Sequence, residues 1–353
     1  MSRFFSNKYQ NLTPYTPGEQ PKDMQYIKLN TNESPFPPAP EALAKAAEAA
    51  KKLQLYSDPE CRDLVSKMAE YYSVTPAELI MTNGSDEVLN FAFMAYCDQN
   101  TPAVYADITY GFYKVFASLV GVPSKVIPLK DDFSIDIEDY INAEGTVFIA
   151  NPNAPTGLLL PLSDIERLVK SNPNRIVVID EAYIDFGGES AIPLTKKYKN
   201  LLVTGTFSKS RSMAGARLGF GIASAELIND LTRIRYSTNP YNVNRMTMAA
   251  GIGALCDDGY FKDNCKKIIE NREWTVRELK KLGFTVTDSK ANFIFAKSDE
   301  IGGEDLYLAL KENGILVRHF NAPRISEYNR ITIGNAEEMQ TLIDKIKEIL
   351  KKK

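Results

Sequence analysis

Histidine and cysteine are scarce in this chain, and their scarcity narrows the chemistry that it can carry. His319 is the only histidine, and none of the four cysteines forms a Cys-x-x-Cys pair. A zinc site needs about four ligands at close spacing, so no metal site is expected. A Ser-His-Asp triad is not expected either, because the lone histidine lies beside Arg318 near a predicted strand end, where it is interpreted as an ordinary polar residue.

Long apolar runs and an excess of one charge are also lacking. No run approaches the ~18 residues of a membrane span, and the N-terminus has no apolar signal segment. The formal net charge of -3 leaves no basic footprint, so nucleic acid is not an expected partner. Together with the unpatterned cysteines, these features predict a cytoplasmic protein.

The chain is long and of ordinary composition. Its 353 residues, 44% hydrophobic and 25% charged, are enough for a large core and two domains. Short apolar runs alternate with helix-like stretches, which predicts βαβ units in a large, mostly parallel α/β sheet flanked by helices. The predicted strands are Leu79–Thr82, Ala103–Ala106, Lys125–Leu129, Thr146–Ala150, Ile176–Asp180, Leu201–Thr206 and Phe220–Ala223.

The pattern changes after Arg245. A mostly helical stretch is followed by short strand-like runs and a final amphipathic helix over residues 336–350, which predicts a smaller α+β domain. Its predicted strands are Phe284–Thr287, Asn292–Ala296, Ile315–Arg318 and Arg330–Ile333. We therefore expect an N-terminal arm with the first part of the small domain in 1–50, the large domain in 51–245 and the C-terminal small domain in 246–353.

One lysine set among hydroxyl side chains is the most informative motif. Lys209 lies among Thr206, Ser208 and Ser210, and Arg217 follows eight residues later. Burial and nearby cations depress the pKa of a lysine and make its amine a good imine former. The segment therefore indicates a lysine that holds pyridoxal phosphate. A single lysine in a polar loop is usually only solvated, so this interpretation depends on motifs elsewhere.

Further motifs follow predicted strands. Gly84 permits a tight turn into a helix whose free N–H groups would favour a phosphate, although a plain strand-to-helix turn is the alternative. Asp180 ends an apolar strand, where ligands bind in α/β sheets, and it can pair with a protonated pyridine nitrogen. Tyr183 lies three residues on and can donate to a phenolate oxygen. No Walker lysine motif accompanies Asp180, so a nucleotide site is not expected.

Taken together, these motifs resemble those of the fold-type I pyridoxal-phosphate aminotransferases. The resemblance covers nearly the whole length, from residue 12 to residue 334. Two segments narrow it to the histidinol-phosphate aminotransferases: Leu12-Thr-Pro-Tyr-Thr-Pro-Gly-Glu-Gln-Pro21 and Pro240-Tyr-Asn-Val-Asn244. The lysine and aspartate motifs mark only the superfamily.

The resemblance implies a role for each matching residue. Lys209 would hold the cofactor as a Schiff base and shuttle the proton, Asp180 would pair with the pyridine nitrogen, and Tyr183 would bond the phenolate oxygen. The other implied cofactor residues are Gly84, Ser85, Asp86, Tyr110, Asn153, Thr206, Ser208, Arg217 and Tyr56. Tyr56 would reach the phosphate held by a neighbouring subunit, which implies a homodimer. The implied substrate residues are Tyr15, Asn32, Arg318 and Arg330.

Two positions depart from the family pattern. The loop that usually reads Asn-Pro-x-Asn-Pro-Thr-Gly has Ala154 where its second Asn would bond the cofactor's phenolate oxygen. Either Asn153 takes over that bond, or Tyr183 makes it unaided. The segment Asp107-Ile-Thr-Tyr110 also lacks the proline often found before the stacking aromatic.

The function implied by the resemblance is transfer of an amino group from histidinol phosphate to 2-oxoglutarate, a step of histidine biosynthesis. Two other enzymes remain open, a threonine-phosphate decarboxylase and an aromatic amino-acid aminotransferase. A catalytically dead, ligand-binding relative is the non-enzyme alternative. The intact set of Lys209, Asp180, Tyr183 and Arg217 argues against it.

Overall fold

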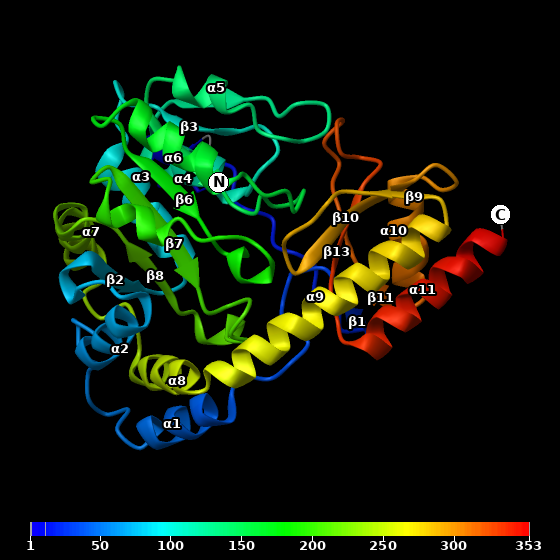
Figure 1. Ribbon diagram of the computed structural model, residues 1–353, viewed down its shortest axis with the longest axis horizontal. Helices are drawn as coiled ribbons and strands as arrows, with labels where there is room; N and C mark the ends of the chain where they lie inside the picture. The colour runs from blue at the N-terminus through cyan, green and yellow to red at the C-terminus, as the bar shows by residue number, and fades with distance from the viewer. Residues whose placement is uncertain (1, 11, 353) are drawn as a thin grey trace.

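The computed structural model describes residues 2–10 and 12–352. A seven-stranded sheet forms the larger part of the molecule, and a smaller group of strands and helices lies beside it (Figure 1). In spatial order the strands of the large sheet are β2 (Leu79–Thr82), β8 (Gly219–Ile222), β7 (Leu201–Thr206), β6 (Val177–Asp180), β5 (Thr146–Ala150), β3 (Ala103–Ala106) and β4 (Ser124–Ile127).

The large sheet is mostly parallel, as predicted. Only β8 runs antiparallel to its neighbours, β2 and β7. The predicted strands all form, four of them with the predicted bounds and three shifted by one or two residues. Apolar residues on both faces of each central strand are buried, which is why these runs read as continuously hydrophobic.

Helices cover both faces of this sheet. One face packs against the apolar sides of α2 (Arg62–Tyr72), α5 (Ile137–Ile141) and α6 (Leu162–Ser171). The other face packs against α3 (Ser85–Tyr96), α4 (Phe112–Val120) and α7 (Ala225–Thr238). The alternation follows from the pleat, which sends successive side chains of one strand into opposite layers.

Two helices from distant parts of the chain extend the first layer. Helix α1 (Pro40–Ala50) packs on α8 (Arg245–Cys256), and their small residues, such as Ala42 and Ala250, share the core cluster of the large sheet. Glycine permits the close approach, since a Cβ at Gly253 would lie 2.5 Å from the carbonyl oxygen of Glu41. The predicted domain limits at 50 and 245 therefore fall at the ends of two helices that pack on the large sheet.

The smaller sheet is antiparallel and has four strands. In spatial order they are β12 (Arg318–His319), β13 (Asn329–Thr332), β10 (Phe293–Ser298) and β9 (Phe284–Val286). A separate parallel pair joins β1 (Ile27–Lys28) to β11 (Ile315–Leu316), so the N-terminal segment is paired with the C-terminal part of the chain. The helices α9 (Asp258–Lys281), α10 (Gly303–Glu312) and α11 (Ala336–Lys351) contribute to the core on this side.

Helix α9 connects the two parts, running from α8 to the small sheet (Figure 1). Five short 3-10 helices complete the secondary structure of the described residues: η1 (Asn7–Tyr9), η2 (Pro76–Glu78), η3 (Ile184–Phe186), η4 (Ile192–Lys196) and η5 (Ala214–Ala216).

Candidate functional site

A cavity of about 680 Å³ lies at the carboxyl ends of the large sheet's strands, facing the small sheet and the N-terminal segment. This volume is within the usual range for a small-molecule site. Thirteen of the sixteen predicted site residues line it: Tyr15, Asn32, Ser85, Asp86, Tyr110, Asp180, Tyr183, Thr206, Ser208, Lys209, Arg217, Arg318 and Arg330. Gly84, Asn153 and Tyr56 do not.

Lys209 is enclosed at the centre of these side chains. Its Nζ donates to the carbonyl oxygen of Thr31 at 3.4 Å and lies 5.9 Å from the centre of the Tyr183 ring. Burial and, to a lesser extent, the positive charge of Arg330 lower the pKa of the Lys209 amine to about 8. A larger fraction of neutral, nucleophilic amine is thus present near neutral pH than for a solvated lysine.

Asp180 ends β6 with its carboxylate almost fully buried. The hydroxyl of Tyr113 donates to Oδ2 and the hydroxyl of Thr204 donates to Oδ1, each at 3.3 Å. Burial and, to a smaller extent, repulsion from Asp86 raise the pKa of Asp180 to about 7. A buried carboxyl of this kind is well placed to hold a cationic nitrogen, which would restore its negative charge.

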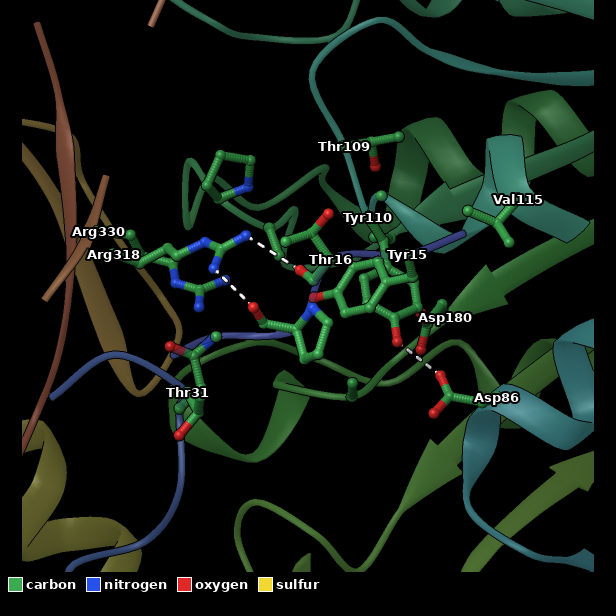
Figure 2. A pocket seen from close by; sticks show the side chains of 18 of the residues that line it. Tyr15, Thr16, Thr31, Asp86, Thr109, Tyr110, Val115, Asp180, Arg318 and Arg330 are labelled. Carbon is green, nitrogen blue, oxygen red and sulfur yellow. Dashed lines mark hydrogen bonds between the residues drawn. The ribbon is translucent and has the colours of Figure 1, made fainter. Parts of the chain in front are cut away.

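The N-terminal end of α3 forms an adjacent corner of the cavity. Asp86 accepts from the hydroxyl of Tyr110 at 2.6 Å (Figure 2). It also accepts from Nη2 of Arg217 at 3.1 Å. Gly84 precedes the helix with a φ of +77°, and a Cβ there would lie only 2.5 Å from Nη2 of Arg217. Gly84 therefore contributes through the turn and the space that it leaves for the arginine.

Two hydroxyl side chains lie beside this corner, one from Thr206 at the end of β7 and one from Ser208 just after it. The hydroxyl of Thr206 donates to Oγ of Ser208 at 2.9 Å and accepts from the Ser208 backbone N–H at 3.1 Å. Together with the N–H groups at the start of α3 and the guanidinium of Arg217, they form a set of donors that suits a phosphate group.

The opposite wall carries two arginines from the small sheet, both reaching toward the N-terminal segment (Figure 2). Arg330 donates through Nη2 to the carbonyl oxygen of Asn30 at 2.8 Å, while its buried Nε has no hydrogen-bond partner among the described residues. Arg318 donates to the carbonyl oxygens of Thr16 and Pro17, each at 3.2 Å. This wall offers positive charge for an anionic ligand.

Tyr15 and Tyr183 complete the cavity lining. The ring of Tyr15 stacks on Phe112 with 4.3 Å between ring centres, which holds the N-terminal segment against α4. The hydroxyl oxygen of Tyr183 accepts a hydrogen bond from Nδ2 of Asn32 at 3.0 Å. Burial raises the pKa of Tyr183, while nearby Arg330 and the Asn32 donor oppose that rise.

All hydrogen bonds of the Asn153 side-chain amide are made to neighbouring protein groups. Its Nδ2 donates to the carbonyl oxygen of Ile108 and to the hydroxyl of Thr156, each at 3.0 Å, and its Oδ1 accepts from Thr109 at 2.7 Å. The neighbouring Ala154 lines the cavity with its methyl group instead. Of the two possibilities raised by the sequence, this arrangement favours Tyr183 acting unaided by an asparagine of this loop.

Tyr56 lies on the surface, away from the cavity lining. Its ring is 80% exposed and stacks on Tyr241 with 4.7 Å between ring centres. Arg245 donates to its carbonyl oxygen at 2.6 Å.

Several contributing residues were not found from the sequence. Thr204 and Tyr113 hold Asp180, and the carbonyl groups of Asn30 and Thr31 hold Arg330 and Lys209. A signal existed for Thr204, because it lies two positions before Thr206 on the same strand and so faces the same side of the sheet. Backbone carbonyl groups leave no such signal in a sequence.

Comparison with known proteins identifies the family to which the chain belongs. Residues 24–346 match the family described as aminotransferase class I and II. The chain belongs to this family. A histidinol-phosphate aminotransferase from Brachyspira hyodysenteriae is 53% identical over 99% of this chain and all of its own length. One from Clostridium botulinum is 48% identical over the full length of both chains. The resemblance inferred from the sequence is confirmed.

A solved structure shares the fold. Histidinol-phosphate aminotransferase from Sinorhizobium meliloti, in complex with pyridoxal-5'-phosphate, superposes with a TM-score of 0.89 at 24% identity, covering 100% of this chain and 99% of that one. The predicted fold class is thereby confirmed. Within residues 2–10 and 12–352, no helix has the length and apolar character needed to cross a membrane. The same residues contain no cluster of three or more potential metal-binding side chains.

Proposed function

We propose that this aminotransferase binds pyridoxal phosphate and moves the amino group of histidinol phosphate onto 2-oxoglutarate, forming imidazole-acetol phosphate and glutamate. One observation carries the proposal: a half-buried lysine with a lowered pKa shares a cavity with a buried carboxylate on one side and two arginines on the other. The relatives at 53% and 48% identity are named histidinol-phosphate aminotransferases, which supports the proposed amino donor.

The residues of the cavity fit the cofactor. Arg217, the hydroxyls of Thr206 and Ser208, and the start of α3 would form a cradle for its phosphate. Asp180 lies deeper, at the end of a central strand, where it can hold a protonated ring nitrogen. When bound, pyridoxal phosphate supplies an aldehyde that a lysine amine can hold and a ring that withdraws electrons from the reacting carbon.

Each residue then has a physical task. Asp180 keeps a ring nitrogen protonated, because an opposite charge favours the charged form of both groups. The Nζ of Lys209 accepts a proton from the substrate carbon and returns it, a task suited to a pKa of about 8. Tyr110 would pack against the pyridine ring of the cofactor, and Tyr183 would donate to the phenolate oxygen of that ring.

The second wall would bind the substrates' anionic groups. Arg330 is half-buried and its buried Nε has no hydrogen-bond partner among the described residues, and such a guanidinium gains strong charge-assisted hydrogen bonds from a phosphate or carboxylate. Arg318 and Tyr15 lie on the same side. Both the donor and the acceptor carry an anionic group, so one cationic wall serves both halves of the reaction.

We also propose a homodimer in which Tyr56 reaches the neighbouring subunit's site. Its exposed ring supports this, as do other exposed apolar side chains near it in sequence or space, because clustered apolar residues on a surface mark an interface. These side chains are Leu53, Leu55, Tyr236 and Tyr241.

The four cysteines are free thiols, which agrees with the cytoplasmic location expected from their spacing.

Product analysis with three amino donors tests the proposal. Purified protein loaded with pyridoxal phosphate is mixed with 2-oxoglutarate and either histidinol phosphate, phenylalanine or threonine phosphate. We expect glutamate to form fastest, by kcat/KM, with histidinol phosphate. Faster glutamate formation from phenylalanine would assign an aromatic amino-acid aminotransferase instead. Release of carbon dioxide from threonine phosphate without an acceptor would assign a decarboxylase.

A further inference from the structure

A short segment after β1 contacts three of the proposed site residues in succession. The carbonyl oxygen of Asn30 accepts from Arg330 at 2.8 Å, and that of Thr31 accepts from Lys209 at 3.4 Å. The next residue, Asn32, contacts its site residue through its side chain instead, and its Nδ2 donates to the hydroxyl oxygen of Tyr183 at 3.0 Å.

Asn32 is held rigidly in this position. It is 1% exposed and adopts a left-handed backbone conformation with a φ of +56°, which asparagine tolerates better than most residues. Its backbone N–H donates to the hydroxyl oxygen of Thr332, and its carbonyl oxygen accepts from Nδ2 of Asn292, each at 3.0 Å. Its side chain therefore has very little freedom to turn.

The bonds to Thr332 also fix which way the amide of Asn32 faces. The hydroxyl of Thr332 accepts from the backbone N–H of Asn32, so its single hydrogen is free to donate to Oδ1 of Asn32, at 3.0 Å. With Oδ1 engaged there, Nδ2 faces Tyr183 and must act as the donor. The phenol oxygen of Tyr183 is therefore an acceptor toward Asn32, and its own O–H points elsewhere.

We propose that Asn32 is a positioning residue that directs the hydroxyl hydrogen of Tyr183 into the cavity. There the hydroxyl donates to the oxyanion of the bound cofactor. This inference rests on the proposed function. It assigns Asn32 a task on the cofactor side, whereas the resemblance had implied contact with the substrate.

Three further observations favour this task. Tyr183 lines the cavity and packs edge-on against Phe293, so its ring cannot swing away from the amide. The loop position that faces the cavity is Ala154, whose side chain has no hydrogen-bonding group. Burial raises the pKa of Tyr183, and donation from Asn32 and the charge of Arg330 only limit that rise, so the hydroxyl keeps its hydrogen at neutral pH and can act as a donor.

The pH dependence of the bound cofactor's visible absorption tests the inference without measuring turnover. A donor at the cofactor's oxyanion stabilises the deprotonated form of the chromophore, so losing that donor raises the pH midpoint of the spectral change. In Asn32→Asp a carboxylate accepts the Tyr183 hydrogen, and Arg330 nearby keeps it ionised. We expect the midpoint to rise by about one pH unit, as for Tyr183→Phe.

Two more variants separate positioning from general damage. In Thr332→Val the amide of Asn32 loses the hydroxyl that orients it, and the midpoint should rise by a smaller amount. Asn329→Asp is the matched control. Asn329 is as deeply buried as Asn32 and lies on the same strand as Thr332, but it donates to the carbonyl oxygen of Gly303, away from the cavity. Its midpoint should equal that of the wild type.

A double variant gives the decisive comparison. If Asn32 acts through Tyr183, the neutral variant Asn32→Leu, which removes the amide without adding a charge, adds no further shift in a Tyr183→Phe background. An additive shift overturns the inference, as does a wild-type midpoint in Asn32→Asp when Tyr183→Phe is shifted. A wild-type midpoint in Tyr183→Phe itself overturns the proposed role of Tyr183 and leaves the assignment of Lys209 standing.

Discussion

The two walls of the cavity are built in different ways. The wall with Lys209, Asp180 and Arg217 comes from strand ends and the adjoining loops of one buried sheet, within a continuous part of the chain. The facing wall joins the N-terminal segment to the small sheet, as in the hydrogen bond from Arg330 to the carbonyl oxygen of Asn30, 300 residues apart. We infer that the first wall holds the cofactor and the second selects and orients the substrate.

This difference has a physical cause. Strands β5, β6 and β7 lie side by side in parallel with all their residues buried or nearly so, so the groups at their carboxyl ends are held rigidly. The facing wall depends on hydrogen bonds from Arg318 and Arg330 to backbone carbonyl groups of the N-terminal segment. Substitutions in the two walls should therefore have different effects on turnover, substrate binding and cofactor binding.

The largest effect is expected from Lys209→Ala, because it removes both the amine that holds the cofactor and the group that moves the proton. Turnover measured by glutamate formation should fall by at least ~10³-fold. Lys114→Ala is the control, because this lysine also lines the cavity but has no proposed task, and its turnover should fall at most a few-fold. Near-normal turnover in Lys209→Ala would contradict the account of the first wall.

Arg330→Ala should weaken substrate binding while leaving the cofactor in place. Loss of a buried charge-assisted bond predicts a KM roughly 10- to 100-fold higher for both histidinol phosphate and 2-oxoglutarate. The visible spectrum of the bound cofactor should be retained, and the exposed Arg277→Ala serves as a control. Loss of the cofactor from Arg330→Ala, with KM unchanged, would show that the two walls are not divided as proposed.

Asp180→Asn should stabilise the cofactor-free protein while impairing its activity. A carboxyl whose pKa is raised from 3.8 to about 7 binds its proton more tightly when folded, so the folded state loses stability as pH rises through that range. The cost at pH 8 is on the order of a few kcal/mol. We expect a melting temperature a few degrees above wild type at pH 8 and a smaller difference at pH 5. A lower melting temperature at pH 8 would contradict this.

The smallest effect is expected at the contact between the walls. Arg324, in the loop between β12 and β13, bonds Asp107 at 2.7 Å and the carbonyl oxygens of Leu129 and Lys130 at 2.9 Å. This ion pair is partly exposed, so its contribution is modest, at most about 1 kcal/mol. Arg324→Ala should raise KM about two- to five-fold, whereas the surface Arg167→Ala should not. Equal KM values for both variants would show that this contact does not support the second wall.

The sequence predicted the first wall better than the second. Asp180 and Thr206 end predicted strands, and the ends of parallel strands must meet at one edge, so their proximity followed from the strand pattern. Gly84 and Arg217 belonged to recognisable local motifs. The order β2-β8-β7 with its antiparallel strand was not foreseen, because strand direction is set by long-range packing that leaves no local pattern.

For the second wall, residue types were foreseen but their partners were not. Arg318 and Arg330 were identified through resemblance, yet no pattern predicted that backbone carbonyl groups of residues 16, 17 and 30 would accept from them. Asn32 was assigned to the substrate because the sequence could not show that its amide faces Tyr183. The roles of the individual site residues stay predictions until the variants are measured.

The most direct test of the central claim is to find the lysine that holds the cofactor. The protein loaded with pyridoxal phosphate is reduced with borohydride, digested, and its peptides are weighed by mass spectrometry. We predict that the added mass of the reduced cofactor is found on Lys209 alone. An unlabelled Lys209, or the label on another lysine, would contradict the account.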